Sequence, residues 1–108
     1  MKRQSSNVIS HRGQLAANAL AGAIRAARQV RGFSQSDLAE HARISLPTLS
    51  RMEHGHPGTA LWAWLSVMEV LGLLHVIEDL RDPATEALAR ATLDRPVRRR
   101  KSRTDLDF

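Results

Sequence analysis

The side chains best suited to specific recognition lie in one short stretch near the middle of the chain. The outward positions of this stretch are expected to be Ser45, Leu46, Pro47, Thr48, Ser50 and Arg51. Hydroxyl groups donate and accept hydrogen bonds, and a guanidinium group donates several from a planar fork. On one face of a helix, such groups match the donors and acceptors that base pairs display in the major groove of DNA. Leu46 and Pro47 offer no side-chain hydrogen bond, but they can pack on a thymine methyl group.

A second candidate surface is a block of positive charge that follows Asp94. The segment RPVRRRKSR, residues 95–103, holds six basic residues and no acidic one. Such a block cannot bury enough apolar surface to fold alone. Its cations can contact phosphates beside a DNA site or an acidic partner protein, and the alternative is a basic end that only aids solubility. The candidate contact residues in this block are Arg98, Arg99, Arg100 and Lys101.

Motifs typical of enzymes and metal sites are absent from the sequence. His54 and His56 lie in the segment EHGH, but this is not the HExxH spacing that places two histidines on one helical face. There is no cysteine, no Ser/His/Asp grouping, no pair of carboxylates typical of a catalytic pocket and no glycine-rich phosphate loop. We therefore expect no enzymatic activity, no metal and no cofactor.

The composition favours a small basic protein of the cytoplasm. The 108 residues include 16 Lys and Arg against 11 Asp and Glu, which gives a formal net charge of +5 and a pI near 11.2. This balance points to a polyanionic partner, most simply nucleic acid. No apolar run approaches the roughly 20 residues that span a bilayer, and MKRQSSNVISHRGQ lacks the apolar stretch of a signal peptide. We expect a cytoplasmic protein that joins the nucleoid when it binds DNA.

The elements that carry these residues are expected to be helices. Alanine-rich segments favour helix, and no stretch alternates as a half-buried strand does. The predicted fold class is therefore all-α. The predicted parts are a flexible N-terminal arm over residues 1–14, a DNA-binding domain over residues 15–82, and a weak helix with a flexible basic tail over residues 83–108.

Capping residues and apolar spacing predict the individual helices. A first helix over residues 15–31 is ended by Gly32. Ser34 begins the next helix, with Asp37 in a variant of the capping box. Ser45 begins another, with a proline in its first turn, and Thr59 is expected to cap a helix over residues 60–71. The predicted apolar faces are Leu20, Ile24, Ala27 and Arg31 on the first helix and Leu61, Trp64, Leu65, Met68 and Leu71 on the last.

Two of these helices follow one another too closely for an ordinary loop. Only Arg43 and Ile44 separate the second helix from Ser45, and Ala39 supplies the small residue that a close crossing needs. This spacing is typical of a helix-turn-helix, whose second helix enters the major groove. Arg43 stands where the turn usually has glycine, so we expect it to take a left-handed conformation at some cost, close to a phosphate. The residues expected to share one core are Leu38, Ala42, Ile44, Leu49 and Met52.

The family resemblance of the chain rests on two stretches, AIRAARQVRGFSQSDLAEHARISLPTLSRMEHG at residues 23–55 and LWAWLSVMEVLGL at residues 61–73. They resemble the Xre/Cro/phage-repressor-like helix-turn-helix family, whose members usually read like IRxxRxxxGLSQxxLAxxxGVSxxTLSRIExG. The resemblance implies a compact bundle of about five helices with a lambda-repressor-like helix-turn-helix. It also implies a homodimeric repressor of palindromic operators, in which Gln35 touches DNA backbone or base and residues 45–51 are the recognition positions.

A narrower resemblance concerns RMEHGHPGTALWAWLSVMEVLGLL, residues 51–74. This segment is similar to small HipB-like antitoxins, which implies a HipA-like toxin kinase as partner and a HipBA-like system that represses its own promoter. Three alternatives are a stand-alone regulator without a toxin, a non-specific nucleic-acid-binding protein driven by the basic tail, and a helix-turn-helix reused for protein contacts.

Two tryptophans and two arginines admit more than one role. Trp62 and Trp64 cannot share a helical face, so Trp64 is expected in the core. Trp62 is then an exposed interface anchor, or another part of the chain covers it. Arg25 and Arg28 either support phosphates or remain solvated or paired within their helix. The candidate residues for a dimer surface are Val76, Ile77 and Leu80.

Overall fold

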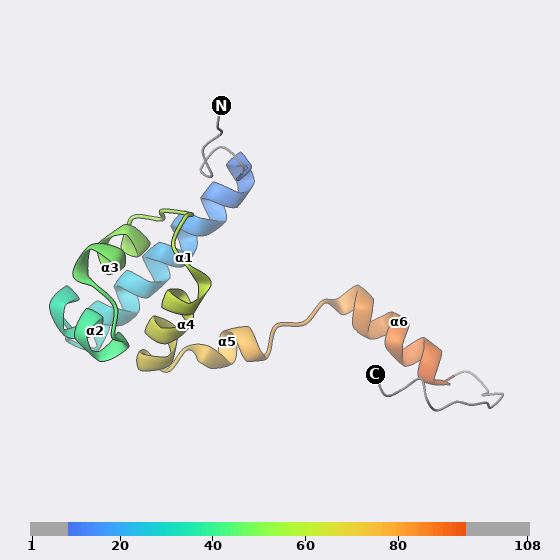
Figure 1. Cartoon of the computed structure of the whole chain (residues 1–108). Helices are drawn as coiled ribbons and strands as arrows, with labels where there is room; N and C mark the ends of the chain where they lie inside the picture. The colour runs from blue at the N-terminus through green and yellow to red at the C-terminus, as the bar shows by residue number, and fades with distance from the viewer. Residues whose placement is uncertain (1–8, 95–108) are drawn as a thin grey trace. The chain divides into compact units, whose positions relative to one another are not determined.

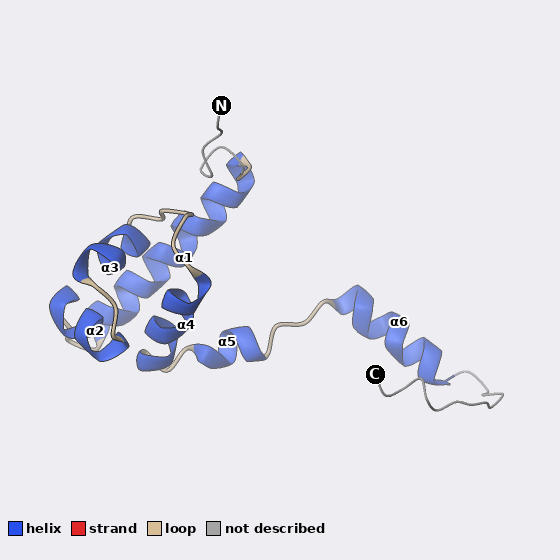
Figure 2. Cartoon of the chain, viewed as in Figure 1, coloured by secondary structure: helices blue, strands red, loops and turns tan. Residues whose placement is uncertain are grey.

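The computed structural model describes residues 9–94, and all regular secondary structure in that range is helical (Figure 2). The chain divides into two compact units, residues 1–78 and residues 79–108. The first unit contains α1 (His11–Val30), α2 (Gln35–Ala42), α3 (Leu46–Glu53), α4 (Leu61–Val70) and α5 (Leu74–Glu78), and the second contains α6 (Pro83–Asp94). The predicted all-α class is confirmed. Within residues 9–94, no helix has both the length and the apolarity needed to cross a lipid bilayer.

The first helix begins at His11 rather than at Leu15, so residues 11–14 of the predicted arm are helical. Ser10 explains the earlier start, because its hydroxyl accepts a hydrogen bond from the backbone N–H of Gly13 at 2.9 Å and caps the helix. α1 stops before Gly32, which takes a φ of 76°, a left-handed conformation that costs glycine little. Residues 1–8 of the predicted arm lie outside the described residues.

One hydrophobic core joins the first four helices. α2 contacts both α3 and α4, and α3 contacts α1 (Figure 1). Ile44, in the turn between α2 and α3, packs against this core, and Trp64 does so from α4. The predicted shared core is confirmed. Its buried members are Ile24, Leu38, Ala39, Ala42, Leu49, Met52, Ala63, Val67, Met68 and Leu71.

Part of the buried face of α1 is shifted by one residue along the chain from the predicted face: Ala21 is buried in place of Leu20, and Arg28 in place of Ala27. Ala21, Ile24 and Arg28 are buried, whereas Leu20 and Arg31, which were expected on this face, are exposed. Arg28 lies on the buried face, where its guanidinium group donates to the buried carboxylate of Glu53 on α3.

The start and the inner face of α4 also differ from the prediction. Ala60 is the N-cap residue and makes no side-chain hydrogen bond, so the predicted cap at Thr59 is wrong. The Thr59 hydroxyl donates instead to the carbonyl oxygen of His56 at 3.4 Å. Leu61 is exposed, against the prediction. Because α4 is apolar around most of its circumference, its pattern could not indicate which face enters the core. The buried residues of this region are Ala63, Val67, Met68 and Leu71.

Two short elements follow α4. Gly72 takes a φ of 74° where a break was predicted, and α5 occupies the short segment after it. α6 covers the helix predicted over residues 84–92 and extends to Pro83 and Asp94. At its start, hydrogen bonds from the Thr85 hydroxyl and the Ala84 N–H hold the pKa of Asp82 below its usual value.

Candidate nucleic-acid interface

The N-terminus of α2 is fixed by a complete capping box. The Ser34 hydroxyl accepts a hydrogen bond from Asp37 N at 3.0 Å, and the Asp37 carboxylate accepts one from Ser34 N at 3.3 Å. These two bonds satisfy backbone donors that the first turn of a helix leaves free. The predicted cap is confirmed, and it holds Gln35, the first residue of α2, in a defined place.

The turn between α2 and α3 is closed by Arg43 in the left-handed region, with φ of 61° and ψ of 42°. The backbone N–H of Arg43 donates to Glu40 O at 3.2 Å, and that of Ile44 donates to Ala39 O at 3.0 Å. Among the described residues, Arg43 alone has a positive φ without being glycine. The predicted left-handed conformation is therefore confirmed. Its side chain is exposed beside α3.

Replacing Arg43 by glycine is expected to raise the free energy of unfolding by about 1 kcal/mol, because the left-handed conformation disfavours a Cβ atom. Chemical denaturation followed by circular dichroism measures this change. Arg43→Ala is the matched control, since it removes the charge and keeps the Cβ atom, and we expect no gain from it. An equal gain in both variants would assign the effect to the charge and contradict the account of strain.

The start of α3 carries a small network of hydroxyl groups. The Ser45 hydroxyl accepts from Thr48 N at 3.2 Å and lies 2.7 Å from the Thr48 hydroxyl, and an Nη atom of Arg51 donates to that hydroxyl at 3.4 Å. Pro47 occupies the first turn, where a missing N–H costs nothing. The predicted Ser45 cap is confirmed.

The outward face of α3 contains the predicted recognition residues. Ser45, Leu46, Pro47 and Arg51 are exposed, while Thr48 and Ser50 are half-buried. The opposite face is fixed in the core through Leu49, Met52 and Glu53. The helix thus combines a rigid inner face with an outer face of hydroxyls, a guanidinium group and an apolar Leu46–Pro47 pair.

A buried ion pair fastens α3 to α1. Arg28 donates through Nε to Glu53 Oε2 at 2.7 Å and through Nη2 to Glu53 Oε1 at 3.0 Å, and its Nη1 donates to Phe33 O at 3.0 Å. Glu53 is 2% exposed and Arg28 9%. The hypothesis that Arg28 supports a phosphate is therefore wrong, because its guanidinium group is used inside the fold. The role of Glu53 was not predicted, although its spacing from Leu49 and Met52 places an acid on the apolar face.

Gln35 joins the same network from α2. Its Nε2 donates to Glu53 Oε1 at 2.9 Å, so a single carboxylate holds α1, α2 and α3. Burial opposes the charged form of Glu53, but hydrogen bonds from Arg28 and Gln35, with the positive charges of Arg28 and Arg25, hold the pKa of Glu53 below its usual value. Gln35 is predicted to contact DNA, and its side-chain amide is held in one orientation by the hydrogen bond to Glu53.

Polar contacts also hold the loop after α3 against α1. Arg25 donates to the carbonyl oxygen of Glu53, and Gln14 donates through Nε2 to the carbonyl oxygen of Gly55 at 2.8 Å. Gly55 has a φ of 77°, and a Cβ atom there would lie 2.4 Å from Asn18 Oδ1. Arg25 is therefore used within the fold as well, and the end of α3 is tied to the first helix.

The histidines of the EHGH segment make local hydrogen bonds. His54 Nδ1 lies 2.7 Å from Ser50 O, and His56 Nδ1 accepts from Gly58 N at 3.1 Å. Among residues 9–94, no group of three or more His, Cys, Asp and Glu side chains could hold a metal ion. The predicted tail contacts Arg98, Arg99, Arg100 and Lys101 lie outside the described residues.

Comparisons with known proteins agree with this geometry. The family model described as "Helix-turn-helix domain" matches residues 19–84. The antitoxin HipB of Escherichia coli is 29% identical over 75 residues, which cover 69% of this chain and 80% of that protein. The crystal structure of ClgR, a clp gene regulator from Corynebacterium glutamicum, matches with a TM-score of 0.50 and 30% identity, covering 72% of this chain and 83% of that one.

Proposed function

The chain belongs to the helix-turn-helix family of DNA-binding regulators, and from this premise we propose that it is a sequence-specific transcriptional regulator that reads DNA with α3. The observation that carries the proposal is the two-sided construction of α3. Its inner face is locked by the core and the Arg28–Glu53 pair, while its outer face is free to enter the major groove. The family indicates a DNA-binding protein rather than an enzyme.

The roles of the site residues follow from their chemistry. We assign the Arg51 guanidinium group to a guanine edge, with Ser45, Thr48 and Ser50 supplying hydroxyl contacts to bases or phosphates. Arg43, just before the start of α3, and Gln35, the first residue of α2, are assigned to the DNA backbone. The tail residues Arg98, Arg99, Arg100 and Lys101 add phosphate contacts outside the operator core, which strengthen binding without selecting sequence.

The Leu46–Pro47 pair is proposed to contact a thymine methyl group. Leu46 is 44% exposed at the start of α3, and an apolar side chain there can recognise only an apolar feature of the groove. Replacing that thymine by deoxyuridine removes one methyl group and is expected to weaken binding about threefold to fivefold. Fluorescence anisotropy measures the effect position by position. Leu46→Ala should bind both DNAs equally, and a similar loss in that variant would refute the contact.

We propose that the regulator acts as a homodimeric repressor of its own promoter. Two α3 helices related by a two-fold axis would enter successive major grooves about 34 Å apart. The candidate surface residues Val76 and Ile77 are exposed on α5, at 51% and 44%, which supports a protein contact in this region.

A HipBA-like toxin–antitoxin role is the second candidate function, favoured by the similarity to antitoxin HipB over 69% of the chain. In this version a HipA-like toxin kinase binds the protein, and the complex represses the shared promoter. Co-purification of a kinase encoded beside this gene, in one-to-one ratio, supports it. A chain that purifies alone and represses fully without such a kinase favours the stand-alone regulator.

Selection from a pool of random DNA duplexes tests the proposed function. At about 150 mM salt, where non-specific binding is weak, the protein should enrich a two-fold symmetric sequence with half-sites about 10 base pairs apart. Failure to enrich any sequence would instead favour the non-specific nucleic-acid-binding alternative, in which the basic tail supplies the affinity.

A further inference from the structure

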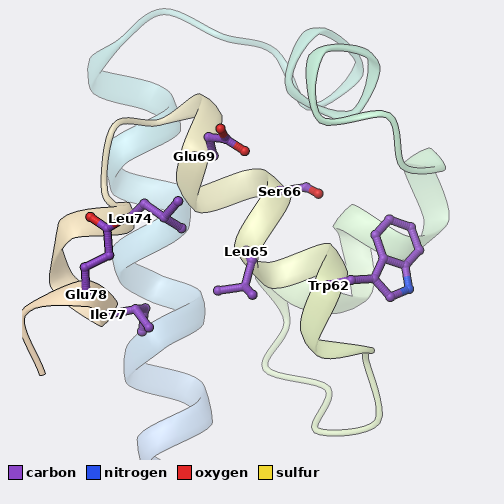
Figure 3. A pocket seen from close by; sticks show the side chains of 7 residues that line it. All are labelled: Trp62, Leu65, Ser66, Glu69, Leu74, Ile77 and Glu78. Carbon is purple, nitrogen blue, oxygen red and sulfur yellow. The ribbon is translucent and has the colours of Figure 1, made fainter.

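A groove runs between α4 and α5 (Figure 3). It has a volume of about 460 Å³, and no residue of α3 is among those that line it. Its α4 side is a row of residues at helical spacings of three and four, which share one face of a helix. Its α5 side includes the first and the last residue of that short helix. The lining residues are Trp62, Leu65, Ser66, Glu69, Leu74, Ile77 and Glu78.

The groove exposes apolar side chains that the described residues leave partly uncovered. Its apolar part is formed by Leu65 and Leu74, which are half-buried, and by Ile77, which is 44% exposed. Trp62, in the first turn of α4, is 61% exposed. A helix that is apolar around most of its circumference, as α4 is, normally packs on more than one side. Exposed apolar clusters rimmed by polar groups mark sites of interaction.

Two carboxylates stand at this apolar surface without a basic neighbour. Glu69 lies in the last turn of α4, Glu78 ends α5, and both side chains are exposed. Neither forms an ion pair within residues 9–94, and residues 69–79 contain no Lys or Arg. The whole chain has a formal net charge of +5. The groove is therefore an acidic site on a basic protein, and its charge repels nucleic acid and attracts cations.

We infer that the groove docks a basic amphipathic segment of another protein. The apolar side chains of this segment cover the apolar part of the groove, as in other complexes of a segment with a groove. Its Lys or Arg side chains face Glu69 and Glu78, and this charge complementarity selects the partner. The exposed indole of Trp62 adds an aromatic anchor that can also stack on a guanidinium group.

The same charges argue against a second copy of this chain in the groove. Two copies would bring four carboxylates together, and like charges in contact cost free energy. The proposed dimer can instead use Val76, which is exposed on α5 and does not line the groove. The inference is independent of the proposed DNA function, because the groove contains no residue of α3.

Selection from a phage-displayed library of short random peptides, with the full chain immobilised, tests the inference. The wild-type chain should enrich peptides that combine Lys or Arg with a large apolar residue. The Trp62→Ala/Glu69→Lys double variant should not enrich them, while circular dichroism shows unchanged helix content. Failure to enrich any peptide, enrichment of acidic peptides, or equal enrichment on the two proteins would overturn the inference.

Fluorescence anisotropy with one labelled, selected peptide tests the role of charge. Glu69→Lys should weaken binding about tenfold or more, because it places like charges in contact. Glu40→Lys is the matched control, since Glu40 is exposed on α2 and lies outside the groove. It should change binding less than about threefold, because solvent and salt screen a distant charge. Salt should weaken the wild-type complex. Equal losses in the two variants, or binding that salt strengthens, would contradict the assigned contact.

The same assay tests the aromatic anchor. Trp62→Ala should weaken peptide binding about fivefold to thirtyfold, as expected for an interface aromatic residue. Leu61→Ala is the matched control, because Leu61 is 70% exposed on the same helix but does not line the groove. It should weaken binding less than about threefold. An equal loss in both variants would mean that the peptide binds elsewhere on α4.

Two further measurements identify other occupants. The synthetic peptide RPVRRRKSR has the sequence of residues 95–103, and binding of this peptide as tight as that of the selected peptides would make the basic tail of this chain the occupant. A dimer in sedimentation equilibrium that Trp62→Ala dissociates would make a second copy the occupant. Either result would overturn the inference of a separate partner. Neither would affect the DNA-binding proposal, which is tested on α3 and with DNA alone.

Discussion

Replacing Glu53 by alanine is expected to lower the free energy of unfolding by about 3–5 kcal/mol, because it leaves the buried Arg28 charge without its partner. The ordinary stability of a domain is about 5–15 kcal/mol, so the variant should unfold at much lower denaturant concentration. The loss is large because one carboxylate accepts hydrogen bonds from both Arg28 and Gln35. Urea denaturation followed by circular dichroism measures it.

The control for this prediction removes both charges. In the Arg28→Met/Glu53→Met double variant no buried charge is left unpaired, so most of the stability should return. A double variant as unstable as Glu53→Ala would mean that the loss reflects packing rather than the unpaired charge.

Acid should reproduce part of the same loss in the wild-type protein. The folded state lowers the pKa of Glu53 below its ordinary value of 4.5, so its stabilisation is present above that pH. The stabilisation is lost as the pH falls through the lower, folded value. Glu53→Gln should lack this component of the pH dependence. An identical acid profile in the two proteins would refute the assigned ion pair.

Replacing Arg51 by alanine is expected to weaken operator binding about 5- to 150-fold, the range for losing a good contact to a base. Arg51 is exposed on α3, and within residues 9–94 its side chain hydrogen-bonds to the Thr48 hydroxyl alone, so helix content should be unchanged. Fluorescence anisotropy with wild-type and single-base-changed operators measures the effect. Relaxed specificity at one base pair would identify the base that Arg51 reads.

Arg31→Ala is the matched control, since Arg31 is an exposed arginine at the end of α1 and outside the reading face. It should reduce affinity at most slightly and equally for all sequences. Full binding by Arg51→Ala, or an equal loss in both variants, would contradict the assignment of α3. Gln35→Ala should also weaken binding, but it removes a hydrogen bond to Glu53, so its stability must be measured alongside.

Local sequence rules predicted the helix-turn-helix itself. Ser34 with Asp37, and Ser45 with a following proline, specify two helix starts through hydrogen bonds within four residues. Arg43 was predicted in the left-handed region because it stands where the turn of a helix-turn-helix usually has glycine. These features depend on neighbours in the sequence, which is why the sequence alone could indicate them.

The features that sequence reasoning missed depend on distant partners. Arg28 and Glu53 are 25 residues apart, and neither residue alone reveals that both are buried and paired. The inner face of α4 was predicted only in part: Met68 and Leu71 are buried as expected, but Leu61 is exposed. Apolar residues surround this helix, and its packing against α2 was needed to show that Ala63 and Val67 are buried. The start of α1 was missed because Ser10 lies in a polar segment that shows no apolar periodicity.

The most direct test of the central claim is a titration of the purified protein with two DNA duplexes at about 150 mM salt. One duplex carries the sequence immediately upstream of its own gene, and the other carries the same bases scrambled. The account predicts a preference of about a hundredfold or more for the upstream DNA, since specific sites commonly exceed non-specific ones by still larger factors. Equal affinity for the two duplexes would contradict it, because binding would then depend on charge and not on the reading face of α3.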